Sequence, residues 1–214
     1  MRNSFKVITL AGALLTAPLV AAHADLIVNG GFEAGQLSAG SYAYPAGTYQ
    51  NWTYTGNGVL INTAGPSPWI SSGQTGYGGD QVVGVQTTGS IAQTFTANIT
   101  GSYLVSWLDA GRLGTGGGNQ TYIVSLLDNT TASSVGSLTL STVAGSNFNT
   151  ESLTGLMNLV AGNSYTLSFT GQDTQDETAL IDNVSVKQVP EPATLSLFGA
   201  GLAGLGWLRR RKAI

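Results

Sequence analysis

The sequence contains no cysteine, so neither a disulfide nor a thiolate metal site can form. Its single histidine, His23, lies inside the signal peptide predicted below. The chain that follows has neither residue, which excludes Ser-His-Asp and Cys-His hydrolysis as well as histidine-bound zinc. Without cross-links the fold must depend on a hydrophobic core, which a stretch of about 165 residues is long enough to bury.

Positive charge is also scarce in the body of the chain. Only Arg112 and Lys187 lie between Asp25 and Val189, against ten acidic residues, so this stretch has a formal charge of −8. Such a field repels a phosphate backbone, and nucleic acid is excluded as a partner. Neutral sugars and divalent cations remain compatible with it.

The N-terminus has the pattern of a secretory signal peptide. Two basic residues within the first six positions precede the apolar run Val7–Val20, and Ala22-His23-Ala24 follows as a small-x-small site. We therefore predict a signal helix in residues 1–24, removed by signal peptidase between Ala24 and Asp25. A buried first helix or an uncleaved anchor is the alternative.

The C-terminus contains a second targeting pattern. Pro190 and Pro192 flank Glu191, and because these prolines cannot continue a strand or helix, they mark a boundary. Residues 193–208 are apolar and residues 209–212 are all basic. The apolar stretch, a little short of the ~20 residues that cross hydrocarbon, predicts a single transmembrane helix. The positive-inside bias keeps the basic end in the cytoplasm and places the preceding domain outside.

This order of segments, from Val189 to Ile214, resembles the PEP-CTERM sorting domain, which has a Pro-Glu-Pro motif, a short apolar helix and an arginine-rich end. The resemblance implies processing by an exosortase, a membrane transpeptidase-like enzyme of Gram-negative bacteria. It also implies export across the inner membrane, a transient membrane anchor, and then a place on the cell surface or in the extracellular matrix. An ordinary single-pass anchor with a proline-rich stem is the alternative.

Between the two ends, in residues 25–188, apolar and polar residues alternate over short stretches. Tyr103, Val105 and Trp107 share one face of such a stretch, and β-branched and aromatic residues are frequent. Glycine- and asparagine-rich breaks separate the stretches. About ten short strands of this kind predict an all-β ectodomain, an antiparallel β-sandwich. The predicted strands are 26–28, 58–62, 81–85, 90–97, 103–108, 120–128, 135–142, 151–159, 165–170 and 180–187.

Three stretches have a more specific resemblance: Leu26–Glu33 at the start of this region, Gly89–Phe95 in its middle and Ala179–Val186 at its end. Together they resemble the galactose-binding-like jelly roll of many carbohydrate-binding modules. The resemblance implies that the first and last strands lie together and that a structural calcium ion is often bound near them.

The last predicted strand gives an independent reason to consider a cation. Leu180, Asp182, Val184 and Val186 fall on one face by period 2, and the apolar members predict that this face is buried. A buried carboxylate is costly unless it is paired or coordinated. Because basic residues are so few, a cation with oxygen ligands is the better partner for Asp182.

Calcium takes its ligands from carboxylate and carbonyl oxygens. We predict that Glu33 and backbone carbonyls near Asn29 and Gly31 complete the calcium site around Asp182. The alternative is that Asp182 accepts backbone N–H groups at a strand end or turn.

Aromatic residues are concentrated in one loop-rich segment. Aromatic rings stack on the apolar faces of sugars, so an exposed subset would form a glycan-binding surface. We predict Trp69 as an exposed ring, with Tyr44 and Tyr77 as further contacts. Packing in the core and loops is the alternative, and the strand-like surroundings of Trp52 favour it there. The rings of this segment are Tyr42, Tyr44, Tyr49, Trp52, Tyr54, Trp69 and Tyr77.

A pair of carboxylates could still support glycoside hydrolysis. The candidates are Asp80, Asp109, Glu151, Asp173, Asp176 and Glu177. We predict instead that the chain is not an enzyme, because the last three lie in one polar loop, which is typical of a solvated turn. The leading hypothesis is a non-catalytic surface or matrix protein associated with exopolysaccharide or biofilm. A lectin-like carbohydrate-binding module with a defined glycan is the alternative, and a secreted carboxylate-dependent glycoside hydrolase is the third hypothesis.

Overall fold

The computed structural model describes residues 24–113 and 118–190. Several segments predicted from sequence belong to the two ends of the chain: the signal helix with Ala22, the motif residues Glu191 and Pro192, the transmembrane helix at 193–208 and the basic end at 209–212. These segments lie outside the described residues, whereas Pro190 is described and lies two residues after the last strand. In the described part of the chain, no helix is long and apolar enough to cross a membrane.

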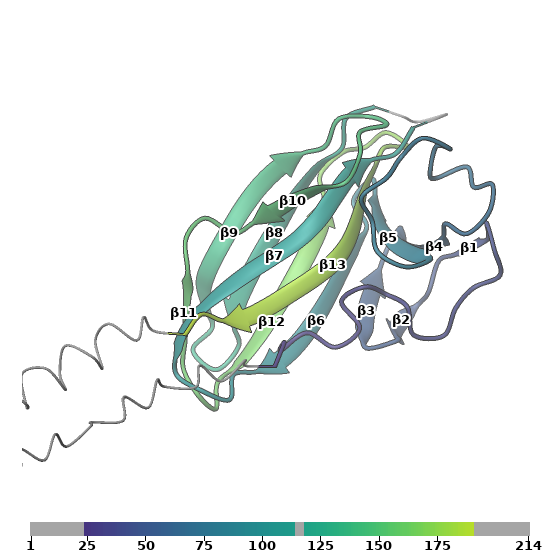
Figure 1. The fold of residues 1–214 in the computed structure, drawn as a ribbon. Helices are drawn as coiled ribbons and strands as arrows, with labels where there is room; N and C mark the ends of the chain where they lie inside the picture. The colour runs from purple at the N-terminus through teal and green to yellow at the C-terminus, as the bar shows by residue number, and fades with distance from the viewer. Residues whose placement is uncertain (1–23, 114–117, 191–214) are drawn as a thin grey trace, which may run out of the picture. The chain divides into compact units, whose positions relative to one another are not determined.

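The described residues form two antiparallel sheets that pack face to face (Figure 1). The first sheet is ordered β1 (Tyr42–Ala43), β4 (Gly58–Asn62), β5 (Gln81–Gln86), β13 (Thr178–Gln188), β7 (Gly101–Gly111) and β10 (Asn149–Ser152), and β11 (Met157–Leu159) also pairs with β7. The second sheet is ordered β2 (Gly47–Tyr49), β3 (Trp52–Thr55), β6 (Ser90–Thr96), β12 (Ser164–Gly171), β8 (Thr121–Asp128) and β9 (Ser133–Ser141). The predicted all-β sandwich is confirmed.

Alternating side chains from both sheets form the main core. Trp52 of β3 and Trp107 of β7 both contact the Phe169 ring of β12, with centroid distances of 6.5 and 5.4 Å. All three residues are buried. Each such side chain contributes about 1.5–3 kcal/mol by leaving water, which is how a chain without disulfides holds its two sheets together. The packing alternative for Trp52 is therefore the one that the structure adopts.

Two of the predicted strands differ from the structure. Residues 151–159 form two short strands, β10 and β11, separated by residues 153–156. Both pair with β7, at opposite ends of that long strand. Residues 26–28 are not a strand, although the backbone N–H of Leu26 donates to the Val186 carbonyl at 3.0 Å. The chain bends here instead of forming a regular ladder.

The N-terminal segment nevertheless lies along the last strand, as the jelly-roll resemblance implied. The Val184 N–H donates to the Gly30 carbonyl at 2.9 Å, and the Val186 N–H donates to Asp25 Oδ1 at 2.9 Å. A Cβ on Gly30 would lie 1.9 Å from the Val184 carbonyl oxygen, so only glycine allows this approach. The start and the end of the sandwich are thus joined directly.

A long irregular segment, residues 63–80, crosses the outer face of the first sheet between β4 and β5 (Figure 1); we call it the strap. It brings Trp69 onto an apolar face formed by Val59, Ile61, Val82 and Leu180. The central strands of the first sheet are therefore buried on both faces. Structureless segments of this length are uncommon in compact domains and usually serve a function.

Candidate functional site

Asp182 is fully buried, but not on the predicted face. The pairing of β13 with β7 shifts register between Asp182 and Ser185, and Asn183 has a left-handed φ of 46°. This bulge reverses the alternation, because one extra residue sends the side chains that follow to the other face. Val184 and Val186 enter the main core, whereas Leu180 belongs to the cluster under the strap. Asp182 shares the face of Leu180, so the prediction of one face for all four residues is wrong.

The Asp182 carboxylate accepts two backbone hydrogen bonds. Gly78 of the strap donates its N–H to Oδ2 at 2.7 Å, and the N–H of Asn183 donates to Oδ1 at 2.7 Å. Burial, and to a smaller extent the nearby charge of Glu33, raises the pKa of Asp182 to about 7, against the lowering effect of the two N–H groups. Asp182 thus accepts the backbone N–H groups that the alternative to calcium predicted, and its calcium site stays a prediction.

Glu33 holds the end of the same strap. Its Oε1 accepts the N–H groups of Asp80 at 2.9 Å and of Gln81 at 2.8 Å. The turn requires glycine at position 79 for two reasons: a Cβ there would lie 2.3 Å from this oxygen, and the backbone has a left-handed φ of 60°. Glu33 and Asp182 together therefore bind the backbone of residues 78–81.

The other two predicted calcium ligands differ in their positions. A Cβ on Gly31 would be 3.4 Å from Asn183 Oδ1, 3.9 Å from Asp182 Oδ1 and 4.0 Å from Glu33 Cγ, so Gly31 lies near both acidic side chains. The Asn29 carbonyl instead accepts hydrogen bonds from Trp52 Nε1 at 3.0 Å and from the Phe32 N–H. Within residues 24–113 and 118–190, no group of three or more acidic or histidine side chains is placed to hold a metal.

Trp69, predicted as an exposed ring, is buried, with 3% of its surface exposed. The Arg112 guanidinium lies over the ring, 3.9 Å from its centroid. Tyr42 and Tyr44 contact the ring at its edges, with centroid distances of 5.4 and 6.3 Å. The prediction failed because the prolines beside Trp69 suggested an exposed turn, whereas the whole segment folds back on the sheet.

Tyr42 and Tyr44, which surround Trp69, are exposed at 49% and 46%. They meet edge to face at 6.1 Å, and beneath them Trp69 fixes their positions. Tyr44 donates its hydroxyl to Gln86 Oε1 at 2.7 Å, and Gln86 donates in turn to Asp176 Oδ1. Partial burial raises the pKa of Tyr44, which keeps this phenol protonated as a donor.

Asp176 and Arg112 complete this cluster. Arg112 Nη1 lies 3.3 Å from Asp176 Oδ1, and the Arg112 side chain is buried while that of Asp176 is 55% exposed. The result is a surface of two tyrosine rings and a carboxylate, with the buried Gln86 and Arg112 beneath it. We call this cluster the tyrosine patch: Tyr42, Tyr44, Gln86, Arg112 and Asp176. From sequence, Arg112 stood out only as one of two cations, and nothing indicated that it meets the aromatic segment.

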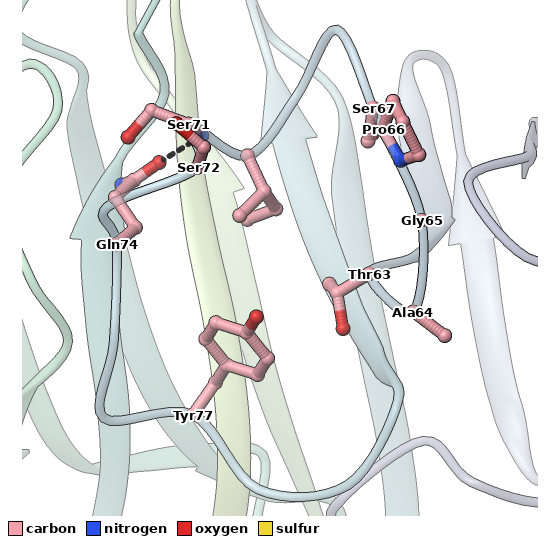
Figure 2. A pocket seen from close by; sticks show the side chains of 10 residues that line it. Thr63, Ala64, Gly65, Pro66, Ser67, Ser71, Ser72, Gln74 and Tyr77 are labelled. Atoms are coloured by element: carbon pink, nitrogen blue, oxygen red, sulfur yellow. Dashed lines mark hydrogen bonds between the residues drawn. The ribbon is translucent and has the colours of Figure 1, made fainter.

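Tyr77 lies apart from the tyrosine patch. It packs on Phe148 at 5.4 Å and lines a hollow of about 550 Å³ enclosed by the strap itself. Figure 2 shows Tyr77 between the two arms of the strap, with Thr63 on one arm and Gln74 on the other. Gln74 fastens the second arm, since its Nε2 donates to the Gly111 and Ser146 carbonyls. Trp69, Tyr44 and Tyr77 therefore do not form one platform.

Three of the carboxylates considered for hydrolysis, Asp109, Asp173 and Asp176, have different structural surroundings. Asp109 accepts the Tyr122 hydroxyl at 2.6 Å in the core, and burial raises the pKa of Asp109 to about 6. Asp173 accepts the Thr121 N–H at 2.6 Å. Asp176 belongs to the tyrosine patch. Asp109 and Asp173 thus hold the fold together through these hydrogen bonds.

Comparison with known proteins identifies the sorting motif of the tail and the fold of the sandwich separately. Residues 188–212 match the PEP-CTERM protein-sorting motif. No curated protein matches the sequence. Among solved structures, TmCBM61 in complex with β-1,4-galactotriose is 12% identical with a TM-score of 0.55, over 78% of this chain and all of that chain.

Two further structures have lower scores. The xylan-binding domain CBM22-1 of Paenibacillus barcinonensis Xyn10C is 14% identical with a TM-score of 0.46, over 73% of this chain and 100% of that chain. The enzymatically active domain of bacteriophage CBA120 tailspike protein 4 is 13% identical with a TM-score of 0.47, over 77% of this chain and 21% of that chain. On the likeness to TmCBM61 and its own sheet topology, the chain is a jelly-roll β-sandwich with the fold of a carbohydrate-binding module, and its PEP-CTERM motif marks it for export and exosortase-dependent sorting to the surface of a Gram-negative bacterium.

Proposed function

We propose that the chain is a non-catalytic surface protein whose sandwich binds extracellular polysaccharide through the tyrosine patch. Its tail is anchored briefly in the membrane and then processed by exosortase, which leaves the sandwich on the cell surface or in the matrix, in association with exopolysaccharide and biofilm. The observation that carries this proposal is the pair of half-exposed rings, Tyr42 and Tyr44, set beside polar groups of fixed orientation.

The chemistry of the patch suits a sugar. A pyranose ring has one apolar face, which stacks on an aromatic ring, and an edge of hydroxyl groups that need hydrogen-bond partners. Tyr44 offers the ring, while the exposed part of Asp176 offers acceptor oxygens. Because Arg112 and Gln86 both bind the Oδ1 atom of Asp176, this carboxylate is held in place before a ligand arrives.

The charge of the domain favours a neutral glycan. The stretch from Asp25 to Val189 has a formal charge of −8, which repels uronic acids and sulfated sugars. The ligand of TmCBM61, β-1,4-galactotriose, is a neutral oligosaccharide and supports the same class. We therefore propose a neutral polysaccharide as the ligand.

Binding of the exported protein to a panel of neutral and acidic polysaccharides tests the proposal. Tyr44→Ala should weaken binding about fivefold and the double change of Tyr42 and Tyr44 to Ala tenfold or more, since an aromatic contact is worth about 1 kcal/mol. Tyr49→Ala is the matched control, because Tyr49 is 40% exposed on β2 and outside the patch. Equal losses in Tyr49→Ala and Tyr44→Ala, or wild-type protein that binds no polysaccharide, would contradict the proposal.

We also propose that a structural calcium ion binds between Asp182 and Glu33. The position of Gly31 supports the site, because this residue lies beside both acidic side chains and has no side chain of its own. Glu33 Oε2 and both Asp182 oxygens accept one N–H group each and keep a lone pair for a cation, whereas Glu33 Oε1 accepts two. With the Asn29 carbonyl engaged elsewhere, Gly31 would supply the carbonyl ligand. Such an ion would neutralise a pair of neighbouring negative charges and fasten the strap to β13.

A further inference from the structure

The second sheet ends in an unusually long edge strand. β9 has nine residues and pairs with β8 on one side, and among the described residues no strand pairs with its other side. The other edges are shorter: β1 has two residues, β2 three, β10 four and β11 three. The free N–H and C=O groups of an edge strand are a template for another strand.

Sequence features that normally protect such an edge are absent from most of β9. Residues 129–150, which include the whole strand and both flanking loops, contain no Asp, Glu, Lys, Arg or Pro. A bulge at Val135, opposite Leu126 and Leu127, interrupts the ladder near its start. From Gly136 to Ser141 the pairing is regular. Proteins usually place a charge, a proline or a bulge on an exposed edge, and these six residues have none.

The side chains of this stretch do not obstruct an approaching strand. Leu138 and Leu140 turn inward and pack on the main core. Ser137, Thr139 and Ser141 alternate with them and are exposed. Small hydroxyl side chains leave the backbone accessible and can form cross-strand hydrogen bonds.

Exposed apolar residues flank β9. Leu127 on the neighbouring β8 is 41% exposed, and Val143, just after β9, is 63% exposed. Leu156, 48% exposed, precedes β11, whose Met157 lies against Gly136 of β9. Exposed apolar side chains therefore lie near both ends of this free edge.

We propose that β9 pairs with β9 of a second copy of this chain, antiparallel and about a two-fold axis, so that the second sheet continues from one copy into the next. A strand that pairs antiparallel with itself gives both copies the same contacts, the usual arrangement in a closed dimer. The charge distribution favours this surface over others for the contact, because two bodies of formal charge −8 repel each other least where the meeting surfaces are uncharged. The whole 129–150 segment meets this condition.

The absence of cysteine from the sequence allows a clean cross-linking test. In the exported protein, Ser137→Cys, Thr139→Cys and Ser141→Cys are made singly and mixed in pairs under mild oxidation. Antiparallel pairing places opposite Cβ atoms about 4.5–5.5 Å apart, close enough for a disulfide after small adjustment. We expect covalent dimers from one single variant or one mixed pair, which also identifies the register. Thr96→Cys, exposed on the interior strand β6, is the control and should remain monomeric on denaturing gels.

Sedimentation over a range of concentrations gives the second readout. Wild-type protein should dimerise, and the double variant of Ser137→Lys with Thr139→Lys should raise the dissociation constant about tenfold or more, since like charges then face each other across the axis. Thr96→Lys should leave dimerisation unchanged. A wild-type monomer at all concentrations overturns the proposal, as does cross-linking no better at β9 than at Thr96. Should the lysine variant fail to fold, judged by its melting temperature, the cysteine series still decides.

Discussion

Replacing Asp182 with Asn should remove a large part of the pH dependence of stability. The pKa of Asp182 is raised from 3.8 to about 7 in the folded protein. This difference corresponds to about 4 kcal/mol, because one pKa unit is worth 1.36 kcal/mol. The stabilisation is complete below about pH 4, is lost as the pH rises toward 7, and is absent above 7, because only the folded state keeps the proton in that window. For a domain of this size, 4 kcal/mol amounts to roughly 8–16 °C in melting temperature.

Thermal melts of wild-type and Asp182→Asn protein at pH 5, 6, 7 and 8, with a chelator present, measure this effect. Between pH 5 and 8, wild type should lose several degrees more than the variant does. Asp109→Asn is the matched control, since burial also raises the pKa of Asp109, to about 6. Calcium distinguishes Asp182 from Asp109, because we expect it to bind only at Asp182. Since it binds the ionised carboxylate, it should stabilise wild type most at pH 8.

A free calcium concentration one hundred times the Kd of the site adds about 2.7 kcal/mol to the free energy of unfolding. Calcium should thus raise the melting temperatures of wild type and Asp109→Asn at pH 8, and leave Asp182→Asn nearly unchanged. Parallel pH curves for wild type and Asp182→Asn in chelator would refute the argument from burial. A wild-type melt that calcium does not move would refute the calcium proposal alone, leaving the fold and the sorting motif as they are.

Three further outcomes are expected. N-terminal sequencing of the surface form should begin at Asp25, and an intact Met1 on that form would exclude cleavage. Deletion of residues 193–214 in a host with exosortase should divert the protein from the surface, as fractionation will reveal; an unchanged distribution contradicts the role of the tail. Gly30→Ala should lower the free energy of unfolding by about 2 kcal/mol or more in denaturant melts, because its Cβ would overlap the Val184 carbonyl. Gly73→Ala, with no atom within 4 Å of its Cβ, should cost far less, and equal losses would contradict the close approach.

The sandwich could be predicted from sequence because its strands alternate regularly. Tyr103, Val105 and Trp107 all enter the main core, as period 2 requires. The bulge after Asp182 could not be predicted in this way. It depends on one left-handed residue, Asn183, and on the approach of Gly30, neither of which changes the local alternation of apolar residues.

The tyrosine patch was partly predictable. Tyr44 belongs to the aromatic segment, and its exposure fits the idea of a stacking ring. The position of Trp69 depends on Arg112, more than forty residues away, whose guanidinium covers the ring. Asp176 joins them from a third part of the chain. Contacts between such distant segments leave no periodic signal, so the strap looked like an exposed loop.

The place where the tail leaves the sandwich determines how the domain bears a pulling force. Any pulling force through the tail reaches the sandwich at Val189, directly after β13. The Val189 N–H donates to the Ser102 carbonyl at 2.8 Å. β13 lies inside its sheet, between β7 on one side and β5 with the N-terminal segment on the other. Its ladder bonds run across the strand, so a pull along the strand loads many of them in shear at once. A domain held by this tail is therefore gripped through one of its most restrained strands, and flow or contact would strain the tail before opening the sheet.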